Sequence, residues 1–163
     1  MIHVVGELSH KVIGFDLSAH PTGVVSPIHG FDPNVIPSNV HLAHQYMMDA
    51  AEICVHPRVP RVLYVSNRWE RHIKEREPHL TDVPDSLPSG DSIAIVLLSG
   101  DGRKVEGIKH VLTDLDVIRG MRISDDGGGV EVYSISGDRA DVWKRVARLN
   151  EGLESGIKHA VWL

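Results

Sequence analysis

Histidine is the residue type in this sequence that first suggests chemistry, because the imidazole ring binds metal ions and exchanges protons near neutral pH. The chain has 11 histidines among 163 residues, and two of them, His41 and His44, have a close spacing of the kind that metal ligands can have. Neither a His-Glu-x-x-His motif nor a pair of cysteines accompanies them. We therefore expect no metal site in this protein.

Three further side chains are candidates for catalysis, although each also has a structural interpretation. Glu52 lies early in one apolar run and Arg68 ends the next, so the two would form an ion pair across neighbouring strands. Arg119 precedes a glycine, which is typical of a solvated turn residue. Asn67 would cap the turn that follows its strand. The residues taken alone leave both interpretations open.

Composition excludes several classes of protein. Acidic residues outnumber basic residues by 22 to 17, and this net charge of −5 argues against nucleic-acid binding. The single cysteine, Cys54, rules out an intrachain disulfide and is expected in a buried strand position. No apolar run approaches the roughly 18 residues of a membrane helix. Together with an N-terminal sequence unlike a signal peptide, this predicts a cytoplasmic protein without membrane contact.

The elements that must position these residues are short strands. Apolar residues alternate with a period close to two in runs that are rich in β-branched residues and bounded by Gly, Pro, Asp or Ser. The pattern predicts an antiparallel all-β fold, with runs at 2–5, 11–17, 23–28, 51–55, 61–66, 92–98, 105–111, 120–124, 129–135, 142–147 and 157–163.

Turns and connections fit this interpretation. Asp101-Gly102 supplies the positive φ of a hairpin turn, and residues 126–129 are a looser version of the same signal. Residues 32–50 predict a short helix or an irregular crossing. Residues 69–91 form an insertion in which Glu70/Lys74 and Arg71/Glu75, spaced i,i+4, predict one or two helical turns.

The strands group into repeated four-stranded units, and repeats of roughly 40–50 residues are typical of β-propeller blades. We predict one partial propeller domain over residues 1–163, with about three blades, one of which lacks a strand. A β-sandwich is the alternative for strands of this length. The predicted parts are a partial blade at 1–31, a connection at 32–50, a complete blade at 51–113 with the insertion at 69–91, a blade lacking its second strand at 114–150, and a terminal strand at 151–163.

Two segments carry a family resemblance. Residues 50–57 (AAEICVHP) followed by 62–68 (VLYVSNR) resemble a signature of the seven-bladed β-propeller lactonase family, which includes 6-phosphogluconolactonases and fungal 3-carboxy-cis,cis-muconate cyclases. Residues 90–95 (GDSIAI) and 116–124 (DVIRGMRIS) are similar to later strands of that family. Seven blades need roughly 300 residues, so the chain resembles the C-terminal portion of such a propeller.

The resemblance implies an activity that needs no cofactor. It places Glu52, Arg68 and Arg119 near a central channel, with Glu52 as acid or base and both arginines binding carboxylates of a small anionic substrate. Asn67 is a further candidate for substrate binding. The implied reaction is cycloisomerisation of 3-carboxy-cis,cis-muconate to its lactone, with hydrolysis of a sugar-acid lactone as the alternative. A third possibility is a truncated, catalytically inactive β-module. Open blade edges invite pairing, so a homo-oligomer is an alternative to such an inactive fragment.

Overall fold

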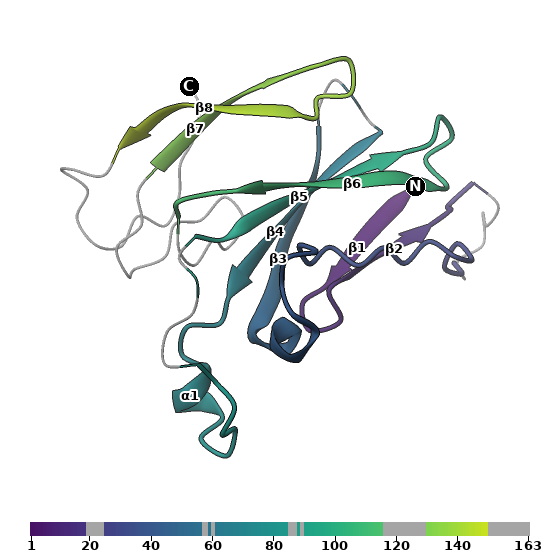
Figure 1. The fold of residues 1–163 in the computed structure, drawn as a ribbon. Helices are drawn as coiled ribbons and strands as arrows, with labels where there is room; N and C mark the ends of the chain where they lie inside the picture. The colour runs from purple at the N-terminus through teal and green to yellow at the C-terminus, as the bar shows by residue number, and fades with distance from the viewer. Residues whose placement is uncertain are drawn as a thin grey trace.

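A computed structural model describes residues 1–18, 25–56, 59, 61–84, 88, 90–115 and 130–149. These residues form antiparallel β-sheets with two short helical segments, so the predicted all-β class is confirmed (Figure 1). The elements are β1 (Ile2–Gly6), β2 (Lys11–Phe15), the 3-10 helix η1 (Leu42–Met47), β3 (Met48–Val55), β4 (Val62–Trp69), the helical turn α1 (Ile73–Arg76), β5 (Ser92–Leu98), β6 (Val105–Leu112), β7 (Val130–Ser136) and β8 (Val142–Leu149).

The central sheet has four strands in the order β3-β4-β5-β6. Each strand pairs with the next one along the chain, as expected for residues 51–113, although the first strand already begins at Met48. All eight residues of β4 are buried. A strand covered on both faces needs apolar or internally bonded side chains at every position, which explains the continuous apolar run at its start.

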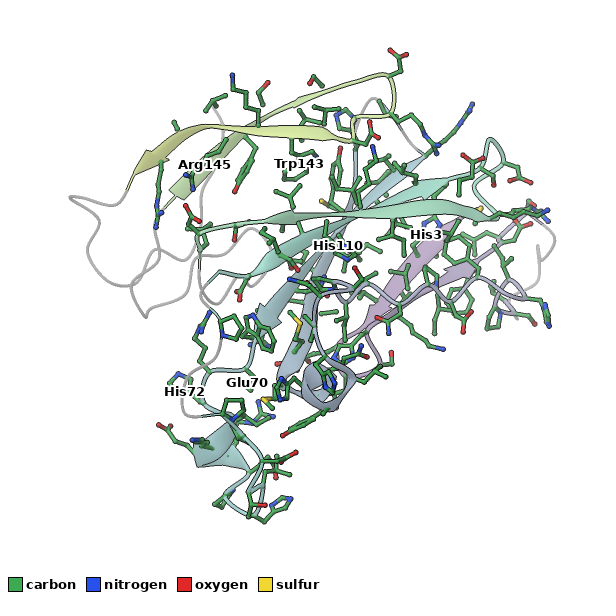
Figure 2. The ribbon with its side chains drawn as sticks, viewed as in Figure 1. His3, Glu70, His72, His110, Trp143 and Arg145 are labelled. Carbon is green, nitrogen blue, oxygen red and sulfur yellow. The ribbon has the colours of Figure 1, made fainter. Side chains whose placement is uncertain are left out.

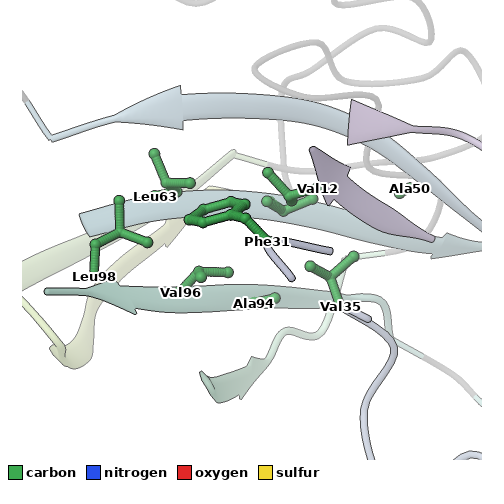
Figure 3. Close-up of a cluster of buried hydrophobic side chains, with 9 residues drawn as sticks. Val12, Phe31, Val35, Ala50, Leu63, Ala94, Val96 and Leu98 are labelled. Atoms are coloured by element: carbon green, nitrogen blue, oxygen red, sulfur yellow. The ribbon is translucent and has the colours of Figure 1, made fainter. Parts of the chain in front are cut away.

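One face of the central sheet packs against the β1–β2 sheet and the segment that follows it. Figure 3 shows this cluster, in which Val12 from β2 and Phe31 lie against Leu63, Val96 and their neighbours. Gly14 permits the close approach of the Phe31 ring, because a Cβ atom at position 14 would lie 3.0 Å from that ring.

The opposite face packs against the β7–β8 sheet. Trp143 of β8 contacts a cluster formed by Val62, Tyr64, Ile95 and Leu97, and its side chain lies between the two sheets in Figure 2. The Tyr64 and Trp143 rings meet edge to face at 4.9 Å. The Tyr64 hydroxyl donates a hydrogen bond of 2.8 Å to the carbonyl of Ala140 in the β7–β8 turn. The central sheet is thus covered on both faces by separate two-stranded sheets.

The connections largely follow the sequence predictions. Helix η1 is the short helix expected within 32–50, and α1 is the helical turn expected after Trp69. Gly102 has a φ of +73°, as predicted, within a longer loop between β5 and β6. The predicted strand at 23–28 is wrong for its described part, since Pro27 forms only an isolated bridge with Phe15.

Cys54 corrects another expectation. The residue is exposed on β3, an edge strand of the described sheet, although partial burial of its thiol raises the pKa of that group. The predicted strands at 120–124 and 157–163 lie outside the described residues, as does the looser turn at 126–129. Within the described ranges, no helix combines the length and apolar character needed to cross a membrane.

Candidate functional site

Glu52 is exposed on β3, where the pairing with β4 is interrupted by a bulge between Ala50 and Ile53. Its backbone N–H donates a hydrogen bond of 3.0 Å to the Ser66 hydroxyl across the two strands. The bulge puts Glu52 level with Ser66, whereas Arg68 pairs with Asp49 before the bulge. The carboxylate of Glu52 can reach a molecule in solution.

Arg68 lies near the end of β4 and is 5% exposed. Its Nη2 atom lies 2.8 Å from Glu7 Oε1 and 3.2 Å from Asp49 Oδ2, and its Nη1 atom lies 4.0 Å from Glu70 Oε2. The predicted ion pair with Glu52 is wrong, because Asp49 is the residue of β3 that faces Arg68 in register. The guanidinium group is surrounded by carboxylates from three parts of the chain.

Asp49 and Glu70 form a buried carboxyl pair beside this guanidinium group. They are 4% and 7% exposed, and both carboxyl groups lie within 4.0 Å of the Arg68 guanidinium group. Burial raises the pKa of Asp49, Arg68 opposes this shift, and the negative charges of Glu70 and Glu7 add to it. A carboxyl group that keeps its proton to higher pH can act as a general acid.

Glu70 also connects the site to α1 (Figure 2). Its Oε2 atom accepts a hydrogen bond of 2.7 Å from Arg76 Nη1, and its Oε1 atom accepts one of 3.3 Å from the backbone N–H of His72. The side chain of Arg76 is 56% exposed, whereas that of Glu70 is 9% exposed. The Glu70 carboxylate is therefore shared between a buried arginine and a solvated one.

Asn67 does not cap a turn, because it lies inside β4 and pairs with Ala50 and Ser92. It is fully buried, and its Nδ2 atom donates a hydrogen bond of 2.8 Å to the carbonyl of Val35. The same carbonyl lies 3.0 Å from His110 Nε2. Asn67 thus fastens the connecting segment to the sheet, while its Oδ1 atom has no partner among the described residues.

The structure brings some of the sequence candidates together and separates others. Arg68 and Asn67 follow each other on β4 and point to opposite faces, Glu52 lies on the neighbouring strand, and Arg119 lies outside the described residues. Sequence reasoning missed Asp49 and Glu70. One available signal was the two-residue spacing of Arg68 and Glu70, which puts both side chains on one face of an extended chain.

Comparison with known proteins adds no family to this geometry. No protein-family model matches the chain, and no curated protein is significantly similar to it. Among the described residues, no three His, Cys, Asp or Glu side chains are grouped so that they could hold a metal ion.

Proposed function

We propose that the chain forms sectors of a lactonase-type β-propeller and acts on a small anionic carboxylate or lactone. The observation that supports this proposal is the central sheet, a four-stranded antiparallel meander with a separate sheet packed on each face. Blades of a propeller pack against their two neighbours in this way. In a propeller the first strand of each blade lines the channel, and in the proposed blade this strand would be β3, which carries Glu52.

The reaction that we propose first is cycloisomerisation of 3-carboxy-cis,cis-muconate. A substrate carboxylate oxygen adds to a carbon of the double bond, and the electron pair of that bond moves to the neighbouring carbon. This carbon takes a proton from the carboxyl group of Glu52, which is then reprotonated by water. The product is a lactone, and no cofactor is needed for any of these bond changes.

Arg68 would bind a second carboxylate of the substrate, together with Arg119. The guanidinium group of Arg68 now contacts Glu7, Asp49 and Glu70, of which only Glu7 has an exposed side chain, at 59%. A substrate carboxylate of the same charge can replace Glu7 without uncovering a buried group. The Glu7→Gln variant should therefore have a lower KM than the wild type.

The test is loss of substrate ultraviolet absorbance with the purified chain, compared with Glu52→Gln. Glu75→Gln serves as the matched control, because the Glu75 side chain is 79% exposed on α1 and far along the chain from the proposed channel strand. Turnover that Glu52→Gln abolishes and Glu75→Gln retains would support the cycloisomerase.

A folded chain without turnover would exclude the cycloisomerase, and a lactone-hydrolysis assay would then test the second reaction. Absence of both activities would leave the catalytically inactive β-module. One observation favours this module, namely that three carboxylates already neutralise Arg68.

A further inference from the structure

β3 forms one edge of the central sheet, and the second half of this strand is not paired on its outer side with any described strand. Its first half is partly covered, since the backbone N–H of Ala50 donates a hydrogen bond of 3.2 Å to the carbonyl of Glu7. Beyond the bulge, three of the five residues 52–56 are exposed. These five residues form an accessible strand edge, which we call the β3 edge.

The backbone groups of the β3 edge point alternately toward β4 and outward. The N–H of His56 donates a hydrogen bond of 3.3 Å to the carbonyl of Val62, so His56 bonds toward β4. Because this direction alternates in an antiparallel ladder, Cys54 also bonds toward β4, whereas Ile53 and Val55 point their N–H and C=O groups outward. These outward groups have no partner among the described residues. Such a row of exposed donors and acceptors is a template for another strand.

The side chains of the β3 edge are arranged symmetrically about Cys54. Ile53 and Val55 flank it, and Glu52 and His56 follow on either side. If a second copy pairs antiparallel with Cys54 opposite Cys54, each Ile53 lies opposite a Val55. Each Glu52 then lies opposite a His56. The outward backbone groups form hydrogen-bonded residue pairs in this register, and the opposed side chains match, apolar with apolar and acid with imidazole.

The imidazole ring of His56 suits this register. Its Nδ1 atom accepts the backbone N–H of Val59 at 3.0 Å, so a neutral ring carries its proton on Nε2. That N–H group can donate to a Glu52 carboxylate on the opposite strand, because the two residues form a non-hydrogen-bonded pair, in which side chains lie closest. A shift of the register by two residues would put Cys54 opposite Glu52 or His56 and lose this contact.

We propose that two copies of this chain associate through the β3 edge, with Cys54 on the two-fold axis, and join their central sheets into one antiparallel sheet. Residues 51–56 contain no lysine, arginine or proline. β6, at the other edge, carries Lys109, and lysine disfavours pairing between strand edges. The pairing puts His56 of the second copy beside Glu52. It does not rest on the proposed catalytic role of Glu52, because association is measured without substrate.

Sedimentation equilibrium of the full chain in a reducing buffer measures the association. The expected result is a reversible dimer with a Kd on the order of 100 μM, because the paired edge is short. Glu52→Lys and His56→Glu should each weaken the dimer by about tenfold, since every dimer contains both opposed pairs. The double variant Glu52→Lys/His56→Glu restores opposite charges and should recover the association. Glu75→Lys, at a side chain that is 79% exposed on α1, is the matched control and should associate as the wild type does.

Disulfide formation tests the register, because Cys54 is the single cysteine of the chain. A non-hydrogen-bonded pair has Cα atoms about 4.5 Å apart, which a disulfide can span. Added diamide takes up the two electrons and two protons that the paired thiols lose. With Cys54→Ser in every chain, a mixture of Glu52→Cys and His56→Cys should form the mixed disulfide. Glu52→Cys alone should cross-link at least about tenfold more slowly, because its two copies lie about 13 Å apart along the strands.

Three results would overturn the proposal. The first is a chain that stays monomeric at concentrations on the order of 1 mM. The second is a dimer that folded Glu52→Lys and His56→Glu do not weaken, which would place the interface elsewhere. The third is oxidation of Cys54 to a dimer no faster than that of Glu75→Cys in the Cys54→Ser chain, which reports random collision. Circular dichroism shows whether each variant is folded, and the cross-linking of Cys54 needs no variant at the interface.

Discussion

Replacing Arg68 by methionine tests whether the buried charge cluster is organised as described. Methionine keeps much of the length and apolar stem of arginine but removes the guanidinium group. The change leaves Asp49 and Glu70, whose side chains are 5% and 9% exposed, without their shared buried cation. It also frees Glu7, which is mostly in solvent.

The expected loss in the free energy of unfolding follows from the exposed fractions of these side chains. Breaking a buried ion pair by removing one partner costs about 3–5 kcal/mol, whereas an exposed ion pair contributes about 0–1 kcal/mol. The raised pKa of Asp49 lets this carboxyl group take up a proton when Arg68 is absent, which limits the cost. We therefore expect Arg68→Met to lower the free energy of unfolding by about 3 kcal/mol at neutral pH.

Urea unfolding followed by circular dichroism measures this change. Arg76→Met is the matched control, because Arg76 binds the same Glu70 carboxylate from a side chain that is 56% exposed. It should lower the free energy of unfolding by at most about 1 kcal/mol. The double variant Arg68→Met/Asp49→Asn should recover part of the loss, since it removes an uncompensated carboxyl group. Equal effects of Arg68→Met and Arg76→Met would refute the reasoning.

Three further predictions concern stability in the same assay. Because the folded-state pKa of Asp49 is raised, its carboxyl group stabilises the protein most below the ordinary pKa of 3.8, and this contribution is lost as pH rises through the raised value. Asp49→Asn should therefore gain stability relative to the wild type as pH rises from the ordinary pKa of 3.8 through the raised folded-state pKa of Asp49. Tyr64→Phe should cost about 1 kcal/mol, as it removes a buried hydrogen bond to a backbone carbonyl; no change would contradict that bond. Gly30→Ala should cost about 1–2 kcal/mol for its positive φ alone. Gly90→Ala should cost clearly more, because its Cβ atom would lie 2.1 Å from the carbonyl oxygen of Thr113, and equal costs would contradict this clash.

The strands of the central sheet could be predicted because their signal is local. Alternating or continuous apolar runs, with an Asp-Gly turn between two of them, predict β3 to β6 in their observed order. The signal fails where pairing is not local. Residues 25–28 have the composition of a strand, but only Pro27 pairs, and it forms one bridge. Proline has no N–H group to donate to a ladder.

The charged site was harder to predict because burial of a charge depends on distant parts of the chain. Glu70 and Lys74 have the spacing of an exposed helical pair, yet α1 begins only at Ile73 and Glu70 is buried before it. Glu70 is buried because the end of β4, Asp49 and the helical turn α1 come together around it. A similar limit applies to Cys54, whose apolar neighbours do not reveal that β3 is an edge strand.

The charge balance of the cluster links its structure to the proposed chemistry. Two arginines, Arg68 and Arg76, face three carboxyl groups, those of Glu7, Asp49 and Glu70, so full ionisation would leave one negative charge in excess. A proton on Asp49 removes this excess, in agreement with the direction of its pKa shift. A substrate carboxylate added beside Arg68 would restore the excess unless Glu7 moved away into solvent. Arg68 can therefore bind a substrate carboxylate without uptake of a further proton by the cluster if that carboxylate takes the place of the Glu7 carboxylate.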